Sequence, residues 1–442
     1  MQLVIVAVGI LALLILILRI KLPAFVALLI VSAGVGLALD MQPAAVLASI
    51  RDGMASTLGF IAVVVGLGAM FGALLEFAGG VQAIANPLLG SMGPARALWA
   101  LGVAGLLVGI PVFFDVGFII LVPLLQQLSE RSGRSPIYFA TPLLAGLLVG
   151  HAFIPPTPGP LAVAELLHAD LGWVIAMGLI CGTPAMIVAG PLLARRFQNV
   201  AVRRATALGD VAPPQQSSGG TISLGHALFT ILLPLVLIVG NTAGQQLLPA
   251  GTVRTTLEFI GHPFVALLIA LLYAYVAFGI TRRVPGQRLQ EIMTRSLEPA
   301  GLIVLVTGAG GVFKEILVDS GVGELMGTFF REQALPPMLL AYVLAALVRI
   351  AQGSATVAMI TSAGLTAPIL QHLQLDEPHT ALVVVAIAAG ASIASHVNDS
   401  GFWLVSRCLN LTEAETLRTW TVLSTVASIV GFAAASVVAA LI

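Results

Sequence analysis

The sequence predicts an all-α protein that crosses a lipid bilayer many times. Of its 442 residues, 58% are hydrophobic and only 9% are charged, whereas about a quarter of the residues in a soluble domain are charged. Apolar stretches of roughly 20 residues, the length that spans the hydrocarbon core, recur along the chain. The formal net charge of +0 and the small number of Lys and Arg residues argue against a nucleic-acid partner.

Ten apolar stretches have the length and composition of membrane spans. The first has no basic region before it and no small-residue cleavage site after it, so we expect a retained span and not a signal peptide. The ten stretches are residues 3–18, 23–39, 55–75, 136–168, 172–194, 225–241, 262–281, 296–316, 380–409 and 419–441.

Four long apolar stretches are interrupted by polar residues or prolines. Residues 97–128 and 338–370 are too long for one span and have a polar kink near the middle, so we predict two re-entrant helical hairpins. Residues 136–168 and 380–409 are predicted to be broken spans. Irregular backbone of this kind is tolerated at membrane depth only where it is buried in protein or lines a cavity.

The basic residues predict the orientation of the spans. With the N-terminus outside, fifteen Lys and Arg residues fall in cytoplasmic loops and four fall outside, while Arg349 lies within a hairpin; together these are the 20 basic residues of the chain. This asymmetry is the one that the positive-inside rule requires. It places the hairpin at 97–128 on the cytoplasmic side, the hairpin at 338–370 on the outer side, and both termini outside.

An internal repeat indicates two halves of opposite orientation. Residues 50–79 align with 292–321 at a shift of 242 positions, with nine identical pairs. Each matched span leads into a predicted hairpin and then a broken span. Such inverted repeats are typical of secondary transporters. We therefore predict a first half over 1–196, a cytoplasmic linker over 197–224 and a second half over 225–442.

The first half contains two polar points at membrane depth. Pro111 breaks the first hairpin close to Phe114 and Asp115, and a carboxylate in an apolar run is costly enough to mark a functional candidate. Its apolar neighbours favour the protonated form, which suits a proton carrier, although Asp115 could instead cap the returning helix. In the broken span, residues 155–160 contain four prolines; His151 lies shortly before them and Thr157 lies among them. His151 is a second proton candidate, or simply a hydrogen-bonded histidine.

The second hairpin contains Arg349, the one basic residue placed well inside the membrane. Gln352, Gly353, Ser354 and Thr356 follow it. A guanidinium can bind a carboxylate with two parallel hydrogen bonds, and the glycine and hydroxyls allow close approach of a polar ligand. We predict that this segment binds an anionic substrate. The alternative is that Arg349 pairs with a structural carboxylate or extends to the membrane interface.

The second broken span contains His396, Asn398, Asp399 and Ser400 between apolar flanks. Asn398 offers both donors and acceptors to substrate hydroxyls. Asp399 and His396 are further proton candidates, and Asp399 could also bind substrate. Metal-ligand spacings, phosphate-binding loops and nucleophile motifs do not occur in the sequence. We therefore expect neither an enzyme nor a metal or organic cofactor, with protons as the coupling ion.

Four strings in these segments together resemble the gluconate permease (GntP) family. They are GIPVFFDVGFIILVPL at 109–124, HAFIPPTPGPLAVAE at 151–165, RIAQGSATVAMITSAG at 349–364 and SHVNDSGFWL at 395–404. The resemblance implies a proton symporter for gluconate or a related sugar acid in the bacterial inner membrane. It also implies scaffold and transport domains, an elevator-type movement and a homodimer.

The substrate stays open at this point. A proton symporter for D-serine or another small hydroxy acid or amino acid is one alternative, and it would need an anionic partner for the amino group. A sodium-coupled dicarboxylate carrier is another, but it would favour a second basic group inside the membrane. An anion channel would not need a pair of occluding hairpins.

Overall fold

The computed structural model describes residues 1–442 except 90–93, 198–221, 323–324, 326–327, 329–335 and 374. Most of the predicted linker at 197–224 therefore lies outside the described residues. The described part is helical and contains no strand, which confirms the all-α prediction. Its α-helices are α1 (Gln2–Leu18), α2 (Ala24–Ala38), α3 (Pro43–Phe77), α4 (Gly80–Leu89), α5 (Pro94–Gly109), α6 (Phe114–Ser132), α7 (Pro136–Phe153), α8 (Pro158–Leu167), α9 (Leu171–Ile187), α10 (Leu224–Leu247), α11 (Thr252–Ile260), α12 (Pro263–Ala274), α13 (Gly286–Arg295), α14 (Leu297–Asp319), α16 (Pro337–Gln352), α17 (Ala355–Gln371), α18 (Glu377–Ser392), α19 (Ser400–Cys408), α20 (Glu413–Thr416) and α21 (Val422–Leu441).

Each predicted span corresponds to a helix or to two consecutive helices. Within the described residues, seven helical segments are long and apolar enough to cross a membrane, and shorter apolar helices such as α1 and α2 accompany them. α3 is longer than predicted because a proline at its first turn starts the helix at residue 43. The short helices α11 and α13 were not predicted from the sequence, because they are too polar to resemble spans.

The segments predicted to be two hairpins and two broken spans each form a pair of helices. α5 and α6 pack together around a bend at residues 110–113, and α16 and α17 pack together around Gly353 and Ser354. α7 is separated from α8 by residues 154–157, and α18 from α19 by residues 393–399. In all four cases the helix is interrupted where the sequence predicted a kink.

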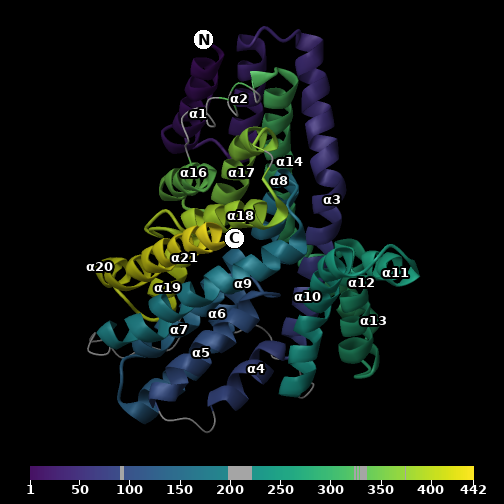
Figure 1. The fold of residues 1–442 in the computed structure, drawn as a ribbon. Helices are drawn as coiled ribbons and strands as arrows, with labels where there is room; N and C mark the ends of the chain where they lie inside the picture. The colour runs from purple at the N-terminus through teal and green to yellow at the C-terminus, as the bar shows by residue number, and fades with distance from the viewer. Residues whose placement is uncertain (90–93, 198–221, 323–324, 326–327, 329–335, 374) are drawn as a thin grey trace.

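The helices form a stack that lies beside a pair of long helices (Figure 1). The neighbours in the stack are α5, α7, α9, α21, α18 and α16 in that order, so α5 packs along α7 and α16 packs along α18. α3 packs along α14 outside the stack, with α2 and α12 against this pair. α3 and α14 run steeply across the direction of the stacked helices.

The first broken span is the most enclosed part of the molecule. In the apolar window of residues 136–167, 94% of residues are buried, compared with 33% for residues 413–441. A span that is apolar on every side and also buried on every side lies inside a bundle, whereas a largely exposed apolar helix faces lipid. The first broken span therefore lies inside the bundle, where irregular backbone is surrounded by protein.

Candidate functional site

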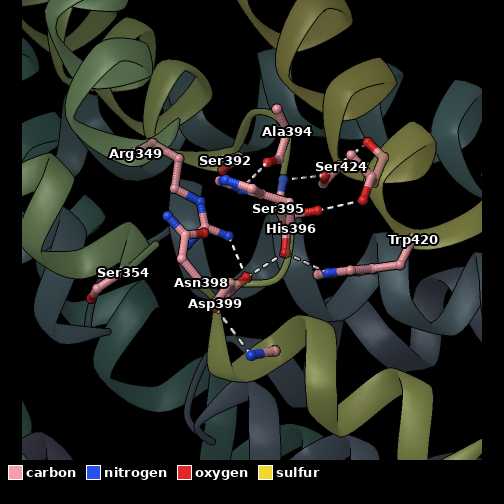
Figure 2. A network of polar contacts seen from close by, with 12 residues as sticks. Arg349, Ser354, Ser392, Ala394, Ser395, His396, Asn398, Asp399, Trp420 and Ser424 are labelled. Atoms are coloured by element: carbon pink, nitrogen blue, oxygen red, sulfur yellow. Dashed lines mark hydrogen bonds and ion pairs between the residues drawn. The ribbon is translucent and has the colours of Figure 1, made fainter. Parts of the chain in front are cut away.

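The second hairpin and the second broken span meet in a buried ion pair. Nη2 of Arg349, in the last turn of α16, lies 2.5 Å from Oδ2 of Asp399, the residue that precedes α19. Arg349 is 3% exposed and Asp399 is 8% exposed. Figure 2 shows the arginine side chain extending toward Asp399. The sequence predicted both residues as functional candidates and gave pairing of Arg349 with a carboxylate as an alternative, but it did not identify Asp399 as that carboxylate.

A hydrogen-bond network holds the Asp399 carboxylate in place. Its Oδ2 accepts a short hydrogen bond from the Ser395 hydroxyl, and its Oδ1 accepts from the Gly401 backbone N–H at 3.1 Å. Nε1 of Trp420 donates to the Ser395 hydroxyl at 2.6 Å, and the Ser395 N–H donates to the Ser424 hydroxyl at 3.1 Å. A buried carboxylate needs such partners to offset its loss of hydration. The network fixes the position of the charge that faces Arg349.

Two other nitrogens of the Arg349 guanidinium are buried without a partner. Neither Nε nor Nη1 has a hydrogen-bond acceptor within the described part of the chain, and Oε1 of Gln352 one turn later also lacks a donor. A buried guanidinium N–H without an acceptor is energetically costly. Arg349 therefore has two donors available for an anion while its third nitrogen binds Asp399.

Asn398 joins the end of α16 to the second broken span. Its Nδ2 donates to the carbonyl oxygens of Ile350 at 2.9 Å and Ala351 at 3.2 Å, two groups left unpaired where the helix ends. Gly353 follows with a φ of 89°, and a Cβ at this position would lie 2.1 Å from the Asn398 carbonyl oxygen. Only glycine fits this backbone conformation and this distance. The two segments are thus held in direct contact.

The tip of the first hairpin reaches the same network. The ring of Phe114 lies 5.2 Å from that of Trp420, and a Cβ on Gly401 would lie 3.6 Å from the Phe114 ring. Asp115 is close enough to Asp399 for the two carboxylates to interact electrostatically. Asp115 forms neither a hydrogen bond nor an ion pair with any residue that the structure describes.

The two carboxylates differ in the exposure of their side chains. Asp115 is exposed, whereas Asp399 is buried. Asp115 lies in the first turn of α6 beside Phe114 and Val116, and the surrounding protein removes part of its hydration, as its apolar neighbours predicted. Asp399 instead precedes its helix and turns back to accept the Gly401 N–H, which carries it inward.

The first broken span lies beside the first hairpin but away from Arg349. The imidazole of His151 is 5.9 Å from the Phe113 ring, and its Nδ1 is buried without a partner among the described residues. Thr157 is buried and donates to the Ile154 carbonyl at 2.8 Å. In the other broken span, Nδ1 of His396 lies 3.1 Å from the Ala394 carbonyl oxygen. The His396 carbonyl oxygen accepts from the Asp399 backbone N–H at 2.8 Å, but neither imidazole hydrogen-bonds to the ion pair among the described residues.

Several helices begin around this network. α6 begins at the tip of the first hairpin, α17 begins after Ser354 and α19 begins after Asp399. Ser354 caps α17 by accepting the Val357 N–H at 3.4 Å. The N-terminus of a helix carries a partial positive charge, so these ends favour an anion. The hydroxyls of Thr356 and Ser400 form no hydrogen bond with other described residues, and Ser400 is exposed.

Comparison with known proteins places the chain in a family. The model of the GntP family permeases matches residues 1–442. The chain belongs to this permease family. It is therefore a multi-pass permease of the bacterial cytoplasmic membrane and not an enzyme.

Similar proteins cover almost the whole chain. The low-affinity gluconate transporter of Escherichia coli K12 is 42% identical over 98% of this chain and 97% of its own length. The Gnt-II system L-idonate transporter of the same strain is 41% identical over the same shares. The YdaH transporter of Alcanivorax borkumensis, a solved structure, matches 89% of this chain and 86% of its own with a TM-score of 0.61 and 17% identity. This last similarity shows the fold.

Two residues of the permease network were missed at the level of sequence. Ser395 was noticed only as part of a polar string, and Trp420 was assigned to an ordinary span. A tryptophan within an apolar helix needs an acceptor for its N–H, which is a signal that could have pointed to Trp420. Nothing in the spacing of the sequence identifies Ser395 as that acceptor.

Proposed function

We propose that the protein imports gluconate or a closely related sugar acid by proton symport. The observation that carries the proposal is the pair of unpartnered, buried nitrogens on Arg349. Nε and Nη1 do not share an edge of the planar guanidinium, because the Nε–H points to the Nη2 side, so each can donate a separate charge-assisted hydrogen bond to a substrate oxygen. Asp399 holds the third nitrogen, so the guanidinium is already oriented when the substrate arrives.

The hydroxyl groups of the substrate have partners around Arg349. The free hydroxyls of Thr356 and Ser400, the Ser354 hydroxyl and the side-chain oxygens of Asn398 and Gln352 supply donors and acceptors. Phe114, which packs on Trp420 at the first hairpin, provides an apolar wall. Thr157, whose hydroxyl donates to the Ile154 carbonyl, is the substrate-binding candidate in the first broken span. The ends of α17 and α19 add a favourable field for the carboxylate.

The names of the relatives favour a sugar acid over the alternatives. Transporters of gluconate and of L-idonate are 42% and 41% identical to this chain. A dicarboxylate would need a second cation near Arg349, and the described membrane helices around the ion pair supply none. D-serine would need a carboxylate for its ammonium group. Of Asp115 and Asp399, only Asp115 is without an ion pair among the described residues.

We assign proton coupling to the titratable groups around the network. Asp399 is engaged by Arg349, Ser395 and Gly401, whereas Asp115 has no such partner and is exposed. Asp115 is therefore our first choice for the proton carrier. His151 and His396 lie in the two broken spans and remain candidates for proton transfer beside it, with Asp399 as the fourth.

The proposed movement is of the elevator type. In it, the stack and the helices that complete the hairpins and broken spans (α6, α8, α17 and α19) move as a transport domain against a scaffold that includes α3 and α14. The two halves form inverted repeats. Each hairpin enters and leaves the membrane on its own side, the first on the cytoplasmic side and the second on the outer side. The protein works as a homodimer. The proposal is supported by the matched packing of α5 on α7 and of α16 on α18. Broken helices near the midplane are typical of such carriers.

Uptake into proteoliposomes tests the proposed function. With purified protein and labelled gluconate, an inward proton gradient should drive accumulation, and a protonophore should abolish it. Unlabelled gluconate and idonate should compete, whereas succinate and D-serine should not. Accumulation that follows a sodium gradient and ignores the proton gradient would overturn the coupling, and competition by D-serine alone would overturn the substrate.

A further inference from the structure

A cavity of about 390 Å³ lies behind the tip of the first hairpin. Its walls come from four elements: Gly72 and Glu76 on α3, residues 111–113 and Val116 of the hairpin, Arg288 and Arg295 on α13, and Pro299 on α14. The positive-inside prediction places both arginines on the cytoplasmic side. Lined by charged groups and large enough for several water molecules, the cavity has the properties of a cytoplasmic vestibule.

Glu76 faces this vestibule from the helix that supports the hairpin tip. A Cβ on Gly72 would lie 2.2 Å from the Pro111 carbonyl oxygen, so α3 and the tip touch at this glycine. Glu76 is four residues later on the same face of α3 and lines the same cavity. Glu76 has no hydrogen bond or ion pair to any described residue. By contrast, Arg288 and Arg295 both bind Glu291, at 2.8 Å and 2.7 Å.

The hairpin tip separates Glu76 from the substrate network. Pro111 and Phe113 line the vestibule, while Phe114 contacts Trp420 and Asp115 interacts with Asp399. The partition between the two compartments is thus a single bend of the chain. A proton that leaves Asp115 toward the cytoplasm must pass this bend, and the vestibule is the aqueous space that begins behind it.

We propose that Glu76 is the group that receives the coupling proton on its way to the cytoplasm. Protonated Asp115 releases its proton toward the bend, water carries it past residues 111–113 into the vestibule and on to the Glu76 carboxylate, and Glu76 releases it to the cytoplasm; no bond other than O–H bonds forms or breaks. This role rests on the proposed proton symport. Arg288 and Arg295 are the charged groups that face Glu76 across the vestibule, and their pairing with Glu291 leaves the Glu76 carboxylate free to accept a proton.

The test compares two transport modes in proteoliposomes. Glu76→Gln removes the proton acceptor and keeps the size of the side chain. We expect proton-driven gluconate uptake to fall by about tenfold or more, the scale on which a positioned proton-transfer group acts. Counterflow between compartments of equal pH should stay within about twofold of wild type, because it requires no net proton release. Glu76→Asp should recover part of the uptake with a changed dependence on internal pH.

The control is Glu130→Gln, which removes an exposed carboxylate near the end of α6 that does not line the vestibule; it should leave both modes unchanged. If the wild-type protein shows no proton-driven uptake, the proposed function fails. If the wild type shows it and Glu76→Gln retains both the uptake and its dependence on internal pH, only the role of Glu76 fails. Equal loss of counterflow and uptake in a variant that still binds gluconate would also overturn that role, because Glu76 would then act in substrate passage.

Discussion

The ion pair between Arg349 and Asp399 allows a structural role to be separated from substrate binding. Arg349→Ala leaves the Asp399 carboxylate buried with hydrogen bonds from Ser395 and Gly401 but without its cation. Breaking a buried pair by removing one partner costs about 3–5 kcal/mol. The double variant Arg349→Ala/Asp399→Asn no longer buries a lone charge, so its free energy of unfolding should be lowered by less than the sum of the two single changes.

Substrate affinity should respond differently from stability. Arg349→Ala removes the two donors that the substrate carboxylate is proposed to accept, and each charge-assisted hydrogen bond contributes about 1.5–3 kcal/mol. Loss of one of them alone weakens binding about ten- to hundredfold. Asp399→Asn should weaken binding less, through loss of the group that orients Arg349. The double variant should bind as poorly as Arg349→Ala, although its stability partly recovers.

The assay measures gluconate affinity and thermal unfolding of the four proteins in detergent or nanodiscs. Arg349→Lys is the matched control because it keeps the charge but loses the planar guanidinium; its affinity should lie between those of wild type and Arg349→Ala. If folded Arg349→Ala binds gluconate as tightly as wild type, Arg349 serves only the ion pair. Recovery of binding in the double variant would point to the same conclusion.

Three further predictions follow from individual features. Gly353→Ala should abolish uptake, measured in proteoliposomes, because its Cβ would lie 2.1 Å from the Asn398 carbonyl oxygen and its φ is 89°; wild-type uptake would contradict the tight contact. Asp115→Asn should abolish proton-driven accumulation but partly retain counterflow, since the amide resembles the protonated carboxyl; continued accumulation against a gradient would exclude it as the proton carrier. In a protein without native cysteines, cysteines at Ser217 and Gln245 should react with an impermeant maleimide from the cytoplasmic and outer sides respectively; reaction of both from one side would refute the topology.

The sequence predicted where the helices break better than it predicted which side chains meet. Pro111 and Gly353 mark the hairpin tips because their backbone chemistry cannot continue a helix. Arg349 and Asp399 were each recognised because a charge in an apolar stretch is costly. The sequence did not identify them as partners, because they are 50 positions apart and no local spacing rule connects them.

The separation of Arg349 from Asp399 along the chain has a consequence for how the protein is made. α16 ends at Gln352 and carries Arg349 in its last turn. Arg349 is synthesised 50 residues before Asp399, which supplies its counter-charge. At about 5–20 residues per second, the ribosome needs roughly 3–10 s to reach Asp399. During that interval Arg349 has no native partner. Placing an arginine at the centre of a bilayer costs about 2.5–3.5 kcal/mol on translocon scales. We therefore expect α16 to remain near the membrane interface or the insertion machinery until α18 and α19 have been synthesised. Formation of the ion pair would then allow the second hairpin to complete its insertion.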